Sequence, residues 1–117
     1  WLRSAGGTNH ESCEDIKVDT AGNVYLTGSF HTSAMFGGTT LFSIGYSDLY
    51  AAKYNTNGDF QWVRSAGGLI KDYGQGIAID TSGNVFVVGN FENKAIYGNQ
   101  TVTSAGNDGF VVARIEK

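Results

Sequence analysis

The stretch WLRSAGG at residues 1–7 returns as WVRSAGG at residues 62–68. With this offset of 61 residues, residues 1–56 align without a gap with residues 62–117, and 20 of the 56 pairs are identical. A repeat of this kind decides the fold before any other pattern, because each copy is one structural unit that packs against its neighbours. The chain is therefore a tandem duplication.

Composition places the chain among ordered globular proteins. It has 117 residues, of which 41% are hydrophobic and 16% charged, with 17 glycines and no proline. The net charge of −3 provides no basic surface for phosphate groups, which argues against nucleic acid as a partner. No apolar run approaches the roughly 18 residues of a membrane-spanning helix, so membrane insertion is not expected. Cys13 is the only cysteine, and we interpret it as a free thiol or a small filler rather than a catalyst.

Each repeat is predicted to consist of short β-strands. The predicted strands are 15–19, 23–30, 49–54 and 60–66 in the first repeat, and 76–80, 84–91 and 109–115 in the second. The first two strands of each repeat are joined by an Asp-Thr-x-Gly turn, at Asp19 and at Asp80, in which the carboxylate can accept backbone N–H groups. The glycine-rich segments 34–42 and 95–103 leave room for an extra hairpin. No segment has a useful helical period.

Several of these strands are apolar on both faces, as in Val85–Val88 and Phe110–Ala113. A sheet with one solvated face would alternate instead. Four-stranded blades arranged radially in a β-propeller are covered on both faces. Tandem immunoglobulin-like domains are the alternative, but they need about 100 residues each. The sequence thus predicts an all-β fold of two four-stranded β-propeller blade repeats, part of a larger or oligomeric propeller.

The residues also resemble a known family. The pattern W-x-R-S-A-G-G, then I-x-[VI]-D-T-x-G-N-V-[YF]-[LV]-x-G-x-F, then a glycine-rich hairpin and [LF]-x-[AV]-A-[KR], resembles the bacterial β-propeller repeat family called SBBP, in two copies. That family is associated with secreted and surface-attached proteins, so the resemblance implies an extracellular or cell-surface location. It carries no catalytic signature. The chain departs from the pattern at one place, because residues 72–76 read DYGQG, close to the family pattern, whereas residues 11–15 read ESCED.

Counting strands predicts complementary ends. Residues 8–68 form a first blade repeat, residues 69–117 form a second that lacks its outer strand, and residues 1–7 form an outer strand that completes another blade. The residues of this blade-closing strand are Trp1, Leu2, Arg3, Ser4 and Ala5. Unpaired edges and uncovered faces favour association. We therefore expect either other copies of this chain in a head-to-tail ring, roughly three or four of them, or flanking blades of a longer parent chain from which this piece is processed or excised.

Divergence between the repeats marks a candidate binding face. All eight positions differ between 8–15 and 69–76, and the segments 31–33 and 92–94 also differ throughout. Loops that diverge are where binding residues are often found, although long loops also drift freely. The candidate ligand-binding residues on this face are His10, Tyr46, Asp72, Tyr73 and Asn107. An exposed tyrosine beside Asp or Asn can stack on a sugar ring, so a carbohydrate-binding propeller is the alternative function.

Three recurring pairs of aromatic residues are expected to be packed in the core between blades. Three pairs recur at the offset of 61: Trp1 and Trp62, Phe30 and Phe91, and Phe36 and Tyr97. Large aromatic side chains in paired positions of this kind are usually buried.

No catalytic or metal-binding pattern emerges. His10 lies close to Glu11 and Cys13, but the spacing matches no zinc template. The segments containing Asp19 and Asp80 offer too few carboxylates for a calcium loop, so we interpret both as turn caps. No cofactor is predicted. The leading hypothesis is a non-enzymatic structural and interaction module of a secreted or surface-attached β-propeller, with a glycan or surface protein as partner. A hydrolase with its site in the central channel is the weaker third hypothesis, because no acid–base pair recurs in both repeats.

Overall fold

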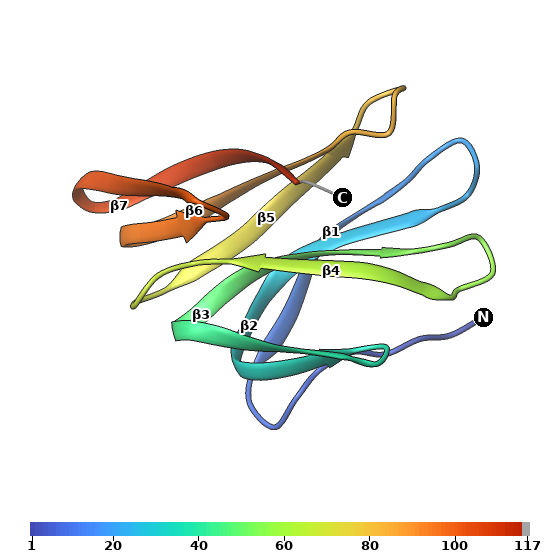
Figure 1. Ribbon diagram of the computed structural model, residues 1–117, viewed down its shortest axis with the longest axis horizontal. Coiled ribbons are helices and arrows are strands. Elements are labelled where there is room, and N and C mark those ends of the chain that lie inside the picture. The colour runs from blue at the N-terminus through green and yellow to red at the C-terminus, as the bar shows by residue number, and fades with distance from the viewer. Residues whose placement is uncertain (116–117) are drawn as a thin grey trace.

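The computed structural model describes residues 1–115 as two antiparallel β-sheets (Figure 1). The first sheet has the order β1-β2-β3-β4, with bounds Glu11–Val18, Val24–Phe36, Thr39–Tyr54 and Phe60–Ala66. The second has the order β5-β6-β7, with bounds Asp72–Ile79, Val85–Tyr97 and Gln100–Ile115. Residues 116 and 117, the last two of the predicted second repeat, lie outside the described residues. The all-β class and the strand order within each repeat are confirmed. In the described part of the chain there is no helix long and apolar enough to cross a membrane.

The strands are longer than the sequence predicted. β1 begins at Glu11 rather than at residue 15, so half of the first divergent loop is strand. The hairpin expected at residues 34–42 is present, but as an extension of existing strands: β2 and β3 continue through this segment and pair as far as Phe36 with Thr39. The expectation stopped short because a bulge between His31 and Ser33 interrupts the alternation that identifies a strand. β6 and β7 carry the same bulge and the same extension.

The Asp-Thr-x-Gly turns have the predicted role. The Asp19 carboxylate accepts the backbone N–H groups of Ala21 and Asn23 at 3.0 and 2.9 Å, and Gly22 adopts a φ of 87°. Asp80 accepts the corresponding two N–H groups of the second repeat. Because glycine adopts positive φ without steric cost, the sequence of this turn fixes its conformation.

The first sheet carries a cluster of buried apolar side chains on each of its two faces. The cluster between the two sheets consists of Tyr25, Leu49, Ala51, Ile77, Val85 and Val87. The cluster on the other face of the first sheet consists of Phe30, Ala34, Phe36, Tyr50, Ala52 and Val63. Successive residues of β3 alternate between the two clusters, as strand geometry requires.

The predicted burial of the aromatic pairs is confirmed in part. Phe30, Phe36 and Phe91 are buried, and Trp62 is partly buried against the cluster between the sheets. Tyr97 is likewise partly buried against that cluster. Trp1 is 64% exposed, so that prediction was wrong. Trp62 lies between two sheets, whereas within residues 1–115 Trp1 has a sheet on one side only.

The glycines of the repeated RSAGG motif lie where the chain crosses closely over a strand of the next sheet, β2 in the first repeat and β6 in the second. Gly6 pairs with Met35, and Gly67 pairs with Ile96 in the second repeat. A Cβ on the next residue, Gly7 or Gly68, would collide with a backbone carbonyl of the hairpin below it, so these positions admit only glycine. The N–H of Gly68 also donates to the Asp72 carboxylate at 2.8 Å. The repetition is therefore explained by packing and by backbone hydrogen bonding.

Residues 11–15, ESCED, depart from the family pattern, but they have the same structural role as residues 72–76 in the second repeat. The N–H of Gly7 donates to the Glu11 carboxylate at 3.1 Å, as Gly68 does to Asp72. β1 and β5 also carry a bulge at the same point, beginning at Cys13 and at Gly74. An acidic residue four positions after the second glycine is thus part of the pattern, although the residues between them differ.

Candidate functional site

Two of the predicted binding residues, His10 and Tyr46, lie in one exposed cluster. The ring centroids of His10 and His31 are 5.9 Å apart, and those of His31 and Tyr46 are 4.7 Å apart. The Lys71 ammonium lies 5.3 Å from the centroid of the Tyr46 ring, within reach of a cation–π interaction. We call these four residues the aromatic–basic patch. His31 and Lys71 were missed as candidates, although both occupy segments that diverge between the repeats.

The patch is positioned by the connection between the two sheets. The N–H of Ser47, next to Tyr46 in β3, donates to the carbonyl of Ile70 at 3.2 Å. The N–H of Glu92 in β6 donates to the carbonyl of Lys71 at 3.1 Å. The linker before β5 is therefore held by backbone bonds to both sheets, which brings Lys71 above Tyr46.

An apolar groove of about 560 Å³ adjoins the patch. The residues that characterise this junction groove are Ile44, Leu69, Ile70, Glu92, Lys94 and Ile96. Leu69 is 79% exposed and Ile44 is 52% exposed, which is unusual for side chains that together line one hollow. Ile70 of the groove directly precedes Lys71 of the patch in the chain.

The other three predicted residues lie elsewhere. Tyr73 is half-buried and lines a separate hollow of about 380 Å³ on the second sheet, with Asn90, Asp108 and Phe110. Asn107 is exposed on β7. Asp72 is fully buried, so it does not reach the binding face. The divergence that suggested Asp72 reflects a change from Glu to Asp that keeps the same bond to the preceding glycine.

Asp72 and Asp48 form a buried acidic pair beside the Gly67–Gly68 segment. One oxygen of Asp72 accepts the Gly68 N–H, and one oxygen of Asp48 accepts the Ile44 N–H at 3.0 Å. The second oxygen of each has no hydrogen-bond partner within the described part of the chain. Burial, together with the nearby charges of Asp48 and Glu92, raises the pKa of Asp72 to about 6, although the Gly68 bond opposes this. Burial also raises the pKa of Asp48.

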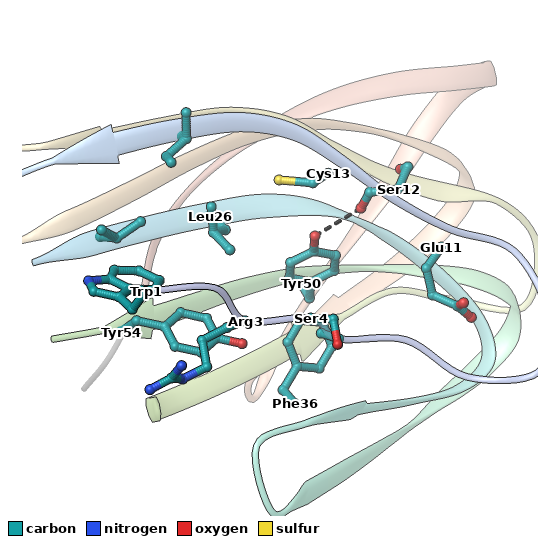
Figure 2. A pocket seen from close by; sticks show the side chains of 13 residues that line it. Trp1, Arg3, Ser4, Glu11, Ser12, Cys13, Leu26, Phe36, Tyr50 and Tyr54 are labelled. Carbon is teal, nitrogen blue, oxygen red and sulfur yellow. Dashed lines mark hydrogen bonds between the residues drawn. The ribbon is translucent and has the colours of Figure 1, made fainter. Parts of the chain in front are cut away.

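A third hollow, of about 330 Å³, lies between residues 1–5 and the first sheet. Its walls are mostly apolar and include Trp1, Phe36 and Tyr54 (Figure 2). The Tyr50 hydroxyl donates to the carbonyl of Ser12 at 2.8 Å, and burial raises the pKa of that hydroxyl strongly. This hollow is an incompletely filled packing surface.

Among residues 1–115, no three or more His, Cys, Asp or Glu side chains are arranged to hold a metal ion. Cys13 is a free, exposed cysteine, as predicted. The surface features that remain, an apolar groove and an aromatic–basic patch, are suited to recognition.

Residues 61–90 match the family model SBBP, described as a beta-propeller repeat. Over these residues the chain is similar to an SBBP β-propeller repeat. An uncharacterized WD repeat-containing protein of Acanthamoeba polyphaga mimivirus is 22% identical over 114 residues, which cover 82% of this chain and 8% of that protein. The chain therefore spans less than a tenth of this relative's length. No solved structure matches the chain significantly. The SBBP match and the WD-repeat similarity support a protein-interaction repeat module.

Proposed function

We propose that the chain is a non-enzymatic interaction module, built as part of a β-propeller, that binds a partner protein in the junction groove. The carrying observation is the exposure of Ile44, Leu69 and Ile96 around one hollow beside the divergent segment 69–76. Burying such side chains contributes about 25 cal/mol per Å² of apolar area removed from water. The SBBP resemblance supports a secreted or surface-attached location for this module.

The chemistry of the groove favours a peptide segment of the partner with apolar side chains and one acidic group. The apolar side chains would fill the hollow, and the carboxylate would meet Lys71 or Lys94 at its rim. Glu92 lies between these lysines in sequence and limits the number of acidic groups that the site accepts.

Selection of peptides from a random display library on the immobilised protein tests the proposal. Peptides with apolar residues and one acid should be enriched, and Leu69→Asp should weaken their binding at least about tenfold, a change of ~1.4 kcal/mol. Phe42→Asp is the matched control, because Phe42 is 72% exposed on β3 but does not line the groove. Equal loss of binding in both variants, or no enrichment, would refute the proposal.

Carbohydrate binding is the second candidate, and the hollow at Tyr73 favours it. An aromatic ring there lies with Asn90 and Asp108, whose amide and carboxylate groups can bond sugar hydroxyls. Glycan-array binding that is abolished by Tyr73→Ala and unaffected by Leu69→Asp would replace the groove proposal. A blank array with assembled protein would remove this candidate.

A further inference from the structure

The packing between the two sheets can be compared with the outer face of each sheet. From the first sheet, Tyr25, Leu49 and Ala51 meet Ile77, Val85 and Val87 of the second sheet. Adding the repeat offset of 61 to the three residues of the first sheet gives Phe86, Phe110 and Val112, on the outer face of the second sheet. Subtracting 61 from the three residues of the second sheet gives Ile16, Val24 and Leu26, on the outer face of the first. All six are apolar, and Phe110, Val112 and Ile16 are 78%, 62% and 55% exposed. The chain thus carries both halves of an interface that it already forms internally.

The segment before β1 is already placed as an outer strand would be. The Trp1 ring stacks on Tyr54 with centroids 6.4 Å apart, and its indole N–H donates to the Thr56 carbonyl at 3.0 Å. Gly6 and Met35 exchange two backbone bonds of 3.1 and 2.9 Å, and Gly67 and Ile96 exchange two of 3.2 and 2.9 Å. Figure 2 shows Trp1 and Arg3 beside Tyr54, over the first sheet. In both repeats the arginine lies 5.8 Å from the tryptophan ring centroid.

The pairing of β3 with β4 supplies a register for this segment. Leu49 pairs with Ala66, and Ala52 pairs with Val63. The same register moved by 61 residues pairs Phe110 with Ala5 and Ala113 with Leu2. Within residues 1–115 no strand pairs with the second edge of β7, which lies at the outside of the second sheet (Figure 1).

We propose that a second copy of this chain docks head to tail on the second sheet. Residues Leu2–Ala5 of the docking copy pair antiparallel with Phe110–Ala113, and its Ile16 face covers Phe110. The side chain of Leu2, now 89% exposed, becomes buried as Val63 is, with 5% exposure. A second copy is the fitting occupant because both surfaces belong to one chain and match an interface seen within it. The contact is heterologous, so repetition of it closes a ring or extends into an open array.

The mass in solution is the first test, measured by light scattering on the full chain. A closed ring of about three or four copies, within the four to eight blades of known propellers, would have three or four times the 12.5 kDa of one chain. A 12.5 kDa monomer at high micromolar concentration would overturn the proposal and leave flanking repeats of a longer chain as the occupant.

Complementary variants test the head-to-tail geometry. Leu2→Asp disables only the docking strand, and Phe110→Asp disables only the surface that receives it, so each alone should be monomeric. An equimolar mixture retains one intact interface and should form a dimer with twice the mass of one chain. Circular dichroism checks that both variants are folded, and Phe42→Asp should assemble like the wild type because Phe42 lies outside the interface. A mixture that stays monomeric would refute the heterologous contact, and so would full assembly of either variant alone.

Discussion

Replacing the buried Asp72 by asparagine should change how stability depends on pH. The pKa of Asp72 rises from 3.8 to about 6 because its carboxylate is fully buried, and because Asp48 and Glu92 add like charge. A folded-state pKa above the unfolded value stabilises the protein below pH 3.8, and this contribution is lost as the pH rises through about 6. At about 1.4 kcal/mol per pKa unit, the ionised carboxylate makes the fold at pH 8 roughly 3 kcal/mol less stable than a neutral one would.

The asparagine side chain keeps part of the native bonding. Its carbonyl can still accept the Gly68 N–H, now bonded at 2.8 Å. Its NH₂ group replaces an oxygen that has no partner among the described residues, and an unsatisfied buried donor costs about 1–3 kcal/mol. The net expectation for Asp72→Asn is a gain of about 1 kcal/mol at pH 8 and a loss of about 2 kcal/mol at pH 4, from the difference between these two terms.

Urea unfolding of both proteins between pH 4 and pH 8 measures this difference. The experiment is best done in the Leu2→Asp background, so that association does not add to the free energy of unfolding. Subtracting the two curves cancels the other carboxylates, including Asp19 and Asp80, whose pKa values are lowered by their turn hydrogen bonds. Glu11→Gln is the control, because it makes the same kind of bond at a half-buried position. The reasoning would be refuted if the free energies of unfolding of Asp72→Asn and its parent stay parallel across this pH range. An equal pH-dependent difference for Glu11→Gln would also refute burial of Asp72 as the cause of the pH dependence.

Two further predictions concern the crossing and the register. Gly68→Ala should lower the free energy of unfolding by about 1–3 kcal/mol, because its Cβ would collide with backbone. Gly38→Ala is the control, because a Cβ there meets nothing within 4 Å, and it should change the free energy of unfolding by less than about 0.5 kcal/mol. Equal effects of the two substitutions in urea unfolding would contradict the prediction. In a Cys13→Ser background, cysteines at Leu2 and Ala113 should form disulfides between copies on mild oxidation. A ladder of covalent oligomers on a non-reducing gel is the expected result, and its absence in an assembled sample would contradict the register.

Local patterns in the sequence were sufficient for the repeat, the turns and the strand order. The identity of RSAGG and of the DTxGN turn at one offset required two copies of one structure. The turn is predictable because the Asp carboxylate and the positive-φ glycine act within five residues. The bounds of β2 and β3 were missed because a bulge at Thr32, with a φ of 64°, shifts the alternation and hides the continuation of the strand.

The candidate site was predictable only in part, since its members are distant in sequence. Divergence between repeats indicated the face and two patch residues, His10 and Tyr46. His31 and Lys71 also lie in divergent segments, but divergence does not show which of those residues meet, because a linker held to both sheets brings these four together. The junction groove was missed for the same reason: its apolar residues come from β3, the linker and β6.

The sequence by itself determined that this chain is duplicated, built of β-strands and turned at Asp19 and Asp80, because periodicity and short-range bonding are written along the chain. Tertiary structure alone decided that Asp72 is buried, that Trp1 is exposed and that Leu2 and Phe110 remain uncovered. These properties depend on which surfaces of two sheets meet. The same alternating pattern supplies apolar residues to every face, and only packing determines which of those faces is covered.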